Sequence, residues 1–294
     1  MATNAGKPPE AWRNYSTKVP IPAFRIKREE LKRLYGMIDS KQLEYRDKIV
    51  ANLSKLPSET DQDFTARKQK VYGAFVTSVT ATSLDDEMLH GNNSAFFESS
   101  TFPERLKSIL ISTRTVPQAV LNLVPLCNIL VFLDFTRPPL FDFGRLPTLP
   151  TPNESNFELS ADDESWFAAT KARLSQFFSD RRTSTNWIHR AAIYDLLLIF
   201  VGVPIAIWAD FRLVGLIDSR RVAPFIISAL YVYVFFVIIV LFRLLFSYSR
   251  WVFPKVELDT ELASPARHRG IWGAVVLALL GSLIYDILKA LAGW

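Results

Sequence analysis

The stretch APFIISALYVYVFFVIIVLF, from Ala223 to Phe242, is an unbroken run of 20 residues without a charged side chain. An α-helix needs about 20 apolar residues to cross the roughly 30 Å hydrocarbon core of a bilayer. Two neighbouring stretches have a similar composition: Ala191 to Ala209, interrupted by Asp195, and Ile271 to Leu291, charged at Asp286 and Lys289. We therefore predict an all-α transmembrane region over residues 191–294, with spans at about 191–209, 223–246 and 271–291. For the two outer stretches, a buried helix or a re-entrant hairpin is the alternative.

Aromatic and basic residues around these stretches favour membrane insertion and suggest an orientation. Tryptophan favours the headgroup level of a bilayer, and five of the seven tryptophans mark span ends: Trp187, Trp208, Trp251, Trp272 and Trp294. Lysine and arginine are enriched on the cytoplasmic side of membrane proteins. Ten lie before the first span or after the second: Lys171, Arg173, Arg181, Arg182, Arg190, Arg243, Arg250, Lys255, Arg267 and Arg269. Four lie on the other side: Arg212, Arg220, Arg221 and Lys289.

This charge difference predicts an integral protein of the cell membrane or bacterial inner membrane, with its N-terminal domain in the cytosol and its C-terminus outside. The first residues, MATNAGKPPEAWRNYSTK, contain no apolar run, so we expect no cleaved signal peptide.

Residues 1–180 have the composition of a soluble α+β domain, and residues 181–190 form a basic juxtamembrane connector. Apolar residues at helical spacing predict a helix over 27–56, and Ser160 with the acidic residues after it predicts the start of a second. Residues 19–26 are predicted to be a short strand or an extended lead-in, and alternating or Val-rich stretches predict strands at 70–83, 106–115 and 156–159, with two more joined near Pro125 within 116–135. This order predicts an antiparallel sheet with two helices on one face.

Composition excludes several function classes. The chain has 294 residues, of which 49% are hydrophobic, and a formal net charge of +5. That charge is too small and too dispersed to indicate nucleic-acid binding. One cysteine, Cys127, excludes an internal disulfide, and the three histidines lie apart at positions 90, 189 and 268. We find no catalytic constellation and no pattern that indicates a metal or cofactor, so the sequence favours a non-enzymatic protein.

A proline-rich segment over residues 137–153 holds five prolines and is predicted to be a long exposed loop. We expect this loop to dock a partner, through Pro138, Pro139, Phe141, Phe143 and Pro147.

Placing an ionisable side chain inside a membrane costs free energy, so such residues are candidates for a functional role. Asp195 and Arg243 are expected at similar depth in the first two spans, so they form a cross-helix ion pair or each reaches water separately. Asp286 and Lys289 are one helical turn apart, which favours a local pair. A face of small residues in the third span, ending on Asp286, predicts close helix packing or an oligomer interface: Gly273, Ala274, Ala278, Gly281, Ser282 and Asp286.

Together these features predict a multi-pass membrane protein of defence or signalling effector type. Its cytosolic domain would sense or dock a ligand or partner and control oligomerisation of the spans or membrane permeability. The expected partners are the lipid bilayer and either a second copy of the chain or another membrane or cytosolic protein. A structural subunit of a larger membrane complex, or a channel or transporter subunit, is the alternative.

Overall fold

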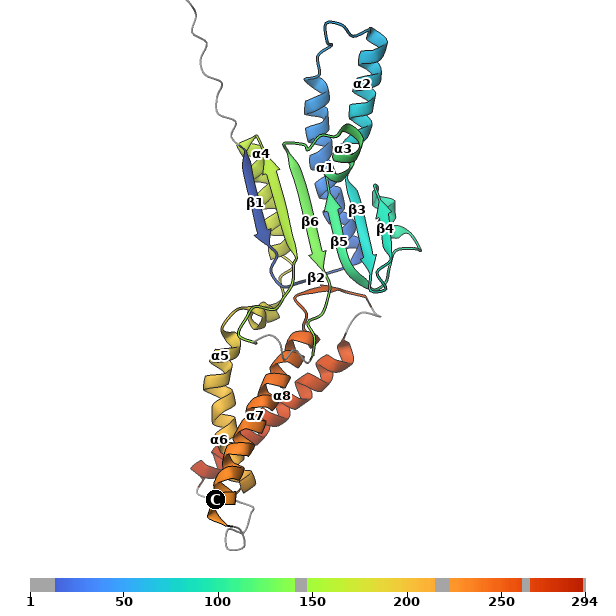
Figure 1. The fold of residues 1–294 in the computed structure, drawn as a ribbon. Coiled ribbons are helices and arrows are strands. Elements are labelled where there is room, and N and C mark those ends of the chain that lie inside the picture. The colour runs from blue at the N-terminus through green and yellow to red at the C-terminus, as the bar shows by residue number, and fades with distance from the viewer. Residues whose placement is uncertain (1–13, 141–146, 215–222, 261–264, 293–294) are drawn as a thin grey trace, which may run out of the picture. The chain divides into compact units, whose positions relative to one another are not determined.

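The structure, a computed structural model, describes residues 14–140, 147–214, 223–260 and 265–292. It divides the chain into two compact units (Figure 1). The sheet unit contains residues 1–135, 154–182 and 256–262, and the helical unit contains residues 136–153, 183–255 and 263–294.

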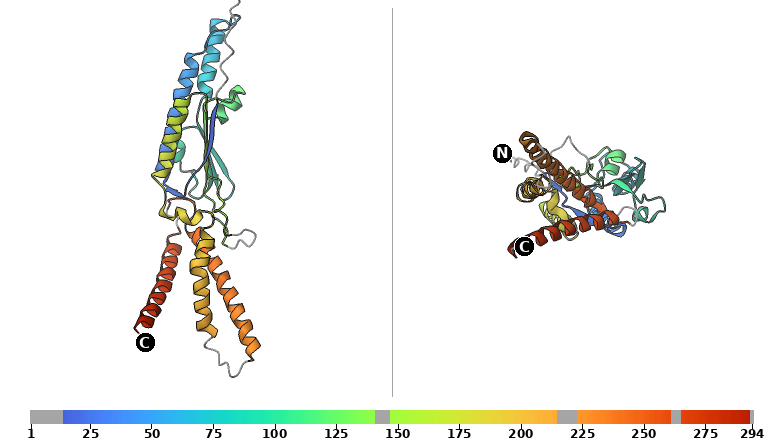
Figure 2. Two further views of the ribbon diagram at one scale, coloured as in Figure 1. Left: turned by 90° about the vertical axis from the view of Figure 1, so that its left-hand side faces the viewer. Right: turned by 90° about the horizontal axis from the view of Figure 1, so that it is seen from below.

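A six-stranded antiparallel sheet in the order β1-β7-β6-β5-β3-β4 forms the centre of the sheet unit. Two helices lie on the same face of this sheet, α1 (Arg28–Ala51) and α4 (Glu164–Ser179), as Figure 2 shows. The strands are β1 (Tyr15–Pro20), β3 (Ser78–Ser83), β4 (Met88–Gly91), β5 (Leu106–Ser112), β6 (Asn128–Asp134) and β7 (Asn156–Ala161), and two further strands, β2 (Phe24–Ile26) and β8 (Val256–Leu258), pair separately. The remaining elements of the unit are α2 (Asp61–Ala74), α3 (Thr115–Leu121) and a 3-10 turn at Ser94–Glu98.

A large apolar core lies between the sheet and these two helices, and a smaller cluster contains Tyr45, Phe75, Cys127 and Ala161. Alternate residues along the strands are buried, as in β6, where Ile129, Val131 and Leu133 are buried. Residues three or four positions apart on α1 and α4 cover them, because this spacing places side chains on one helical face. The predicted antiparallel sheet and its two covering helices are thus present.

Two of the predicted strands are wrong in part. Residues 70–74 continue helix α2, which begins at the Thr60 cap, where the hydroxyl accepts a hydrogen bond from the Asp63 amide at 3.1 Å. Residues 115–121 form helix α3, because Ser112 accepts hydrogen bonds from the amides of Arg114 and Thr115, both at 3.2 Å. Only the second strand of the predicted pair in 116–135 exists, as β6.

The second covering helix also begins later than expected. Ser160 belongs to β7, and the cap is Asp163, whose carboxylate accepts hydrogen bonds from the amides of Ser165 and Trp166. A carboxylate is at least as good a cap as a hydroxyl, so the chain uses the acidic residue that follows the strand.

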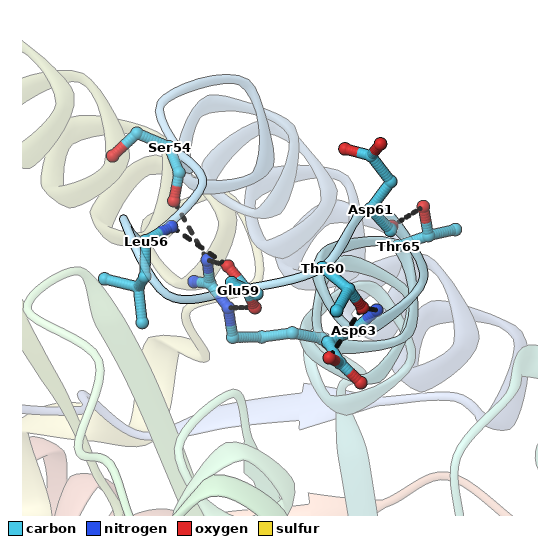
Figure 3. A network of polar contacts seen from close by, with 8 residues as sticks. Ser54, Leu56, Glu59, Thr60, Asp61, Asp63 and Thr65 are labelled. Carbon is cyan, nitrogen blue, oxygen red and sulfur yellow. Dashed lines mark hydrogen bonds and ion pairs between the residues drawn. The ribbon is translucent and has the colours of Figure 1, made fainter.

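A compact polar network closes the turn between α1 and α2 (Figure 3). The Arg67 guanidinium donates to both carboxylate oxygens of Glu59 at 2.8 Å and to the Ser54 carbonyl at 2.9 Å. Hydrogen bonds from Arg67 and from the Leu56 amide lower the pKa of Glu59 to about 2. Bidentate pairs of this kind fix geometry, so the two helices leave the turn in a defined direction.

The helical unit contains three helices that are long and apolar enough to cross a membrane, at Ile193–Arg212, Pro224–Val252 and Arg267–Asp286. The first is built from α5 (Ile193–Leu197), a π-helical turn (Leu198–Gly202) and α6 (Val203–Val214). The others are α7 (Pro224–Val252) and α8 (Ala266–Leu291), and a 3-10 turn at Ser184–His189 precedes α5.

The two units do not follow the sequence order expected for two consecutive domains. Segment 136–153 groups with the helical unit, although it lies between two strands of the sheet. Segment 256–262 groups with the sheet unit, although it lies between α7 and α8. The chain therefore passes between the units at several points.

Candidate functional site: the connections to the apolar helices

The short strand β2 bonds to two segments that lead to or from the apolar helices. It pairs in parallel with β8, which begins four residues after α7 ends, in the register Phe24 to Val256 and Ile26 to Leu258. Phe24 also forms an antiparallel bridge with Arg182, the last residue of the sheet unit before α5. We call Phe24–Ile26, Arg182 and Val256–Leu258 the β2 junction.

The apolar side chains of the β2 junction belong to the core of the sheet unit. Phe24 and Ile26 are 0% exposed, and Val256 and Leu258 are also buried. The Phe24 ring packs edge-on against Phe178 of α4, with 5.3 Å between ring centroids. A shift of β8 would therefore disturb the core of the sheet unit, because close-packed interiors do not deform gradually.

One ion pair crosses the β2 junction. The Arg25 guanidinium lies 3.1 Å from the Glu257 carboxylate, and Glu257 is buried. Partly buried pairs of this kind fix register more than they add stability, since desolvation offsets much of their attraction.

The sequence pattern predicts an extended segment at 19–26, where β2 lies, but neither β8 nor its pairing with β2. Val256–Leu258 is a three-residue strand with a charged centre, which is too short for an alternating pattern to be recognised. The only local sign is the order apolar, charged, apolar after Pro254.

Within the helical unit, the second half of the proline-rich segment is bonded to the start of the first apolar helix. The Ala192 amide donates to the Thr148 carbonyl at 3.0 Å, and the Thr148 hydroxyl donates to the Asp195 carboxylate at 2.8 Å. Ala192 itself has φ = 62°, a left-handed conformation that is strained for a residue with a Cβ. We call Thr148, Thr151, His189, Ala192 and Asp195 the helix-start site.

The residues predicted to dock a partner lie in different environments. Pro147 is buried, Pro138 is half-buried and Pro139 is exposed. Phe141 and Phe143 lie outside the described residues. Docking by this loop stays a prediction, and its described second half instead holds the helix-start site in place.

His189 is buried at the helix-start site and is 5% exposed. Its Nδ1 lies 2.9 Å from the Thr151 hydroxyl. Burial, followed by the nearby charges of Arg250 and Lys255, lowers the pKa of His189 to about 4, against the opposing effect of the Phe253 backbone. His189 is therefore neutral at pH 7, which suits a ring enclosed beside two cations.

Because His189 is buried in its neutral form, we expect the helical unit to lose stability at acid pH. Above pH 6.5 the ring is neutral whether the unit is folded or unfolded. As the pH falls from about 6.5 to about 4, the unfolded state takes up a proton that the folded state does not, so stability falls by up to about 3 kcal/mol. Thermal unfolding in detergent across this range should show a smaller loss for His189→Gln. His90→Gln, at an exposed histidine of the sheet unit, is the control; equal acid sensitivity in wild type and His189→Gln would contradict the prediction.

Asp195 lies at the helix-start site, bonded to Thr148. Both Asp195 and Arg243 lie within electrostatic range of the Tyr194 side chain. Both charges therefore lie near the same tyrosine, as expected for antiparallel helices. A direct ion pair between Asp195 and Arg243 stays a prediction.

Asp286 bonds to a different helix than expected. Its carboxylate lies 2.9 Å from the Arg212 guanidinium at the end of the first apolar helix. The predicted small-residue face of α8 is open within the chain: Ala274, Ala278, Gly281 and Ser282 are exposed, and Gly273 is half-buried. A Cβ added at Gly273 or Gly281 would meet no atom within 4 Å. Its role as an oligomer face stays a prediction.

The first apolar helix contains an irregular centre. Pro204 has no amide hydrogen to donate to the preceding turn, and the π-helical turn Leu198–Gly202 ends two residues before it. At Gly202 an added Cβ would lie 3.1 Å from the Phe242 ring of α7. Gly202 therefore allows a close approach of the first two apolar helices, which also meet through Tyr194 and Phe246, with 5.3 Å between ring centroids.

Among the residues that the structure describes, no group of three or more His, Cys, Asp or Glu side chains is placed to hold a metal. The Cys127 thiol is buried and donates to Asp162 at 3.1 Å. Burial, together with this hydrogen bond, raises the pKa of the thiol to about 12, so it is protonated and unreactive at neutral pH.

Comparison with protein-family models, with curated proteins and with solved structures finds no match to this chain, so its function has to be argued from its own residues.

Proposed function

We propose that this chain is a non-enzymatic integral membrane protein of the effector type. In this proposal its sheet unit binds a ligand or partner in the cytosol, and the state of that unit is passed to three membrane spans whose assembly alters membrane permeability. The β2 junction is the observation that carries the proposal.

Membrane insertion is supported by length, composition and exposure. In α7 and α8 the most apolar window buries none of its residues inside the chain, and in the first helix only 17%. An exposed face this apolar would aggregate in water, whereas lipid or a second copy would cover it.

The strand pairing supports a topology in which the sheet unit, the basic segment before the first span and the basic segment after the second span lie on the same side of the membrane. Arg182 precedes the first span, Val256 follows the second, and both bond to Phe24. A bilayer cannot separate bonded strands, so two spans cross between these points and return the chain to the side it left. The excess of basic residues on that side favours the cytosol.

Coupling is supported by the burial of the junction. One three-residue strand bonds to the chain before the first span and after the second, and its two apolar side chains, Phe24 and Ile26, lie in the core of the sheet unit. A binding event that shifts this core has two covalent routes to the spans, one from Arg182 to Ile193 and a shorter one from Val256 back to Val252.

A charge-swap series across the β2 junction tests the proposal. Full-length protein in liposomes is assayed for ion leakage and, in detergent, for oligomeric mass. We expect Arg25→Glu to change both readouts, because it places two carboxylates at the junction, and the double variant Arg25→Glu/Glu257→Arg to restore them.

Lys18→Glu is the matched control, since Lys18 pairs with Glu158 at 2.8 Å on the main sheet and not on the junction. Equal leakage and mass in the wild type and all variants would overturn the coupling. No leakage from any variant, with a co-purifying protein lost when residues 137–153 are deleted, would instead favour a structural subunit of a larger complex.

A further inference from the structure

Basic and aromatic residues lie where the first apolar helix begins, where α7 ends and where α8 begins, and we call these residues the collar. Segments 183–192, 243–255 and 265–272 contain no Asp or Glu. Their lysines and arginines are Arg190, Arg243, Arg250, Lys255, Arg267 and Arg269. Lysine and arginine side chains at a membrane surface attract anionic lipids.

Aromatic contacts hold the end of α7 against the start of α8 within this collar. The Trp272 indole donates to the Ser249 hydroxyl at 2.6 Å, and the Trp251 and His268 rings lie 4.9 Å apart, edge to face. The Arg137 guanidinium lies over the Trp251 ring at 5.1 Å. Tryptophan and arginine together at this level are typical of the headgroup region of a bilayer.

Arg250 is the buried member of the collar. It is 7% exposed, its Nε donates to the Ile188 carbonyl at 3.0 Å, and the Phe246 ring lies 4.7 Å from the guanidinium. Its Nη2 is buried with no hydrogen-bond partner, and no carboxylate among the described residues pairs with Arg250. Natural proteins rarely bury a charge without a counter-ion, because removing the charge from water is costly.

We propose that the phosphate of an anionic lipid headgroup supplies this counter-ion, with Arg250 turning its Nη2 toward the lipid. Guanidinium groups match the geometry of phosphate oxygens, and a phosphodiester lies at the depth where α7 ends. No anion is supplied by the neighbouring His189, whose ring is neutral at pH 7. Lys255, like Arg250, adds positive charge near that ring. The inference rests on the proposed membrane insertion and names a lipid class for it.

Lipid titration of the purified full-length chain in detergent tests the site. Phosphatidylglycerol, phosphatidylcholine and inorganic phosphate are added separately, and bound lipid is counted by native mass spectrometry. We expect phosphatidylglycerol to bind at least about tenfold more tightly than phosphatidylcholine, because the phosphate of phosphatidylcholine is already balanced by its own choline cation, whereas phosphatidylglycerol brings a net negative charge to the guanidinium. We expect Arg250→Gln to lose most of that preference and Arg250→Lys to keep part of it.

Arg173→Gln, at an exposed arginine of α4, is the control and should keep the full preference. Equal binding of the two lipids, or an unchanged preference in a folded Arg250→Gln variant, would overturn the lipid site. Saturation of the effect by inorganic phosphate alone would overturn the lipid as its source. Flotation of wild type with uncharged liposomes separates the two proposals: a chain that floats but shows no lipid preference loses only this site, whereas one that does not float loses membrane insertion as well.

Discussion

Phe24→Ala should lower the stability of the sheet unit by about 3–5 kcal/mol, the usual cost of removing a fully buried phenylalanine ring. The ring is 0% exposed and packs against Phe178. Its loss leaves a cavity beside the backbone that bonds to both Arg182 and Val256. The expected result is therefore a weaker sheet unit and a looser connection to the apolar helices.

Hydrogen exchange of the full-length chain measures this effect separately from the helical unit. Amides of β6 and β7 report the stability of the main sheet, and those of β8 report the junction. Both should exchange faster in Phe24→Ala than in the wild type. Phe64→Ala is the control, because Phe64 is half-buried on α2 and its ring should contribute much less. Equal acceleration of exchange by both variants would show that Phe24 contributes no more than Phe64 to the stability of the sheet and of the β2 junction.

Gly202→Val should separate the first two apolar helices and destabilise the helical unit by about 1–3 kcal/mol, as overpacking typically does. A Cβ at this position would lie 3.0 Å from the Leu198 side chain and 3.1 Å from the Phe242 ring. The ring belongs to a packed neighbour, so the helix has to move. Valine adds two methyl groups to that clash.

Spin labels on exposed positions of the two helices, Leu196 and Leu241, measure the separation. We expect a longer or broader distance distribution in Gly202→Val. Gly273→Val is the matched control, a glycine of α8 where an added Cβ meets nothing within 4 Å, and should leave the distribution unchanged. An unaltered distribution in a folded Gly202→Val variant would remove the close approach as a feature of the packing.

Strong periodic patterns in the sequence predicted much of the fold. The alternation in NILVFLDF identified β6, and the uncharged run from Ala223 identified α7, because each pattern is long enough to exclude the other structure. Residues 70–74 were assigned to a strand because their alternation was considered without the Thr60 cap ten residues earlier. The alternation in residues 70–74 is too short to end the helix that begins at Asp61.

The candidate site was much less visible in the sequence. Asp195 stood out because a carboxylate interrupts an apolar run, but its partner Thr148 lies 47 positions earlier in a segment with no regular structure. Phe24 and Val256 are apolar residues in short strands, and nothing local marks them as neighbours. Contacts between distant segments depend on tertiary packing, which a single sequence does not display.

The place of β8 in the chain has a consequence for how the protein is made. Glu257 lies 232 positions after Arg25, its partner in the same unit. A nascent chain emerges from its N-terminus, so β2 is synthesised long before β8 and stays without that neighbour until α5, α6 and α7 have followed. The sheet unit can begin to fold early, but its last strand arrives only after two apolar helices have left the ribosome. Completion of the folded domain is thereby tied to delivery of those helices.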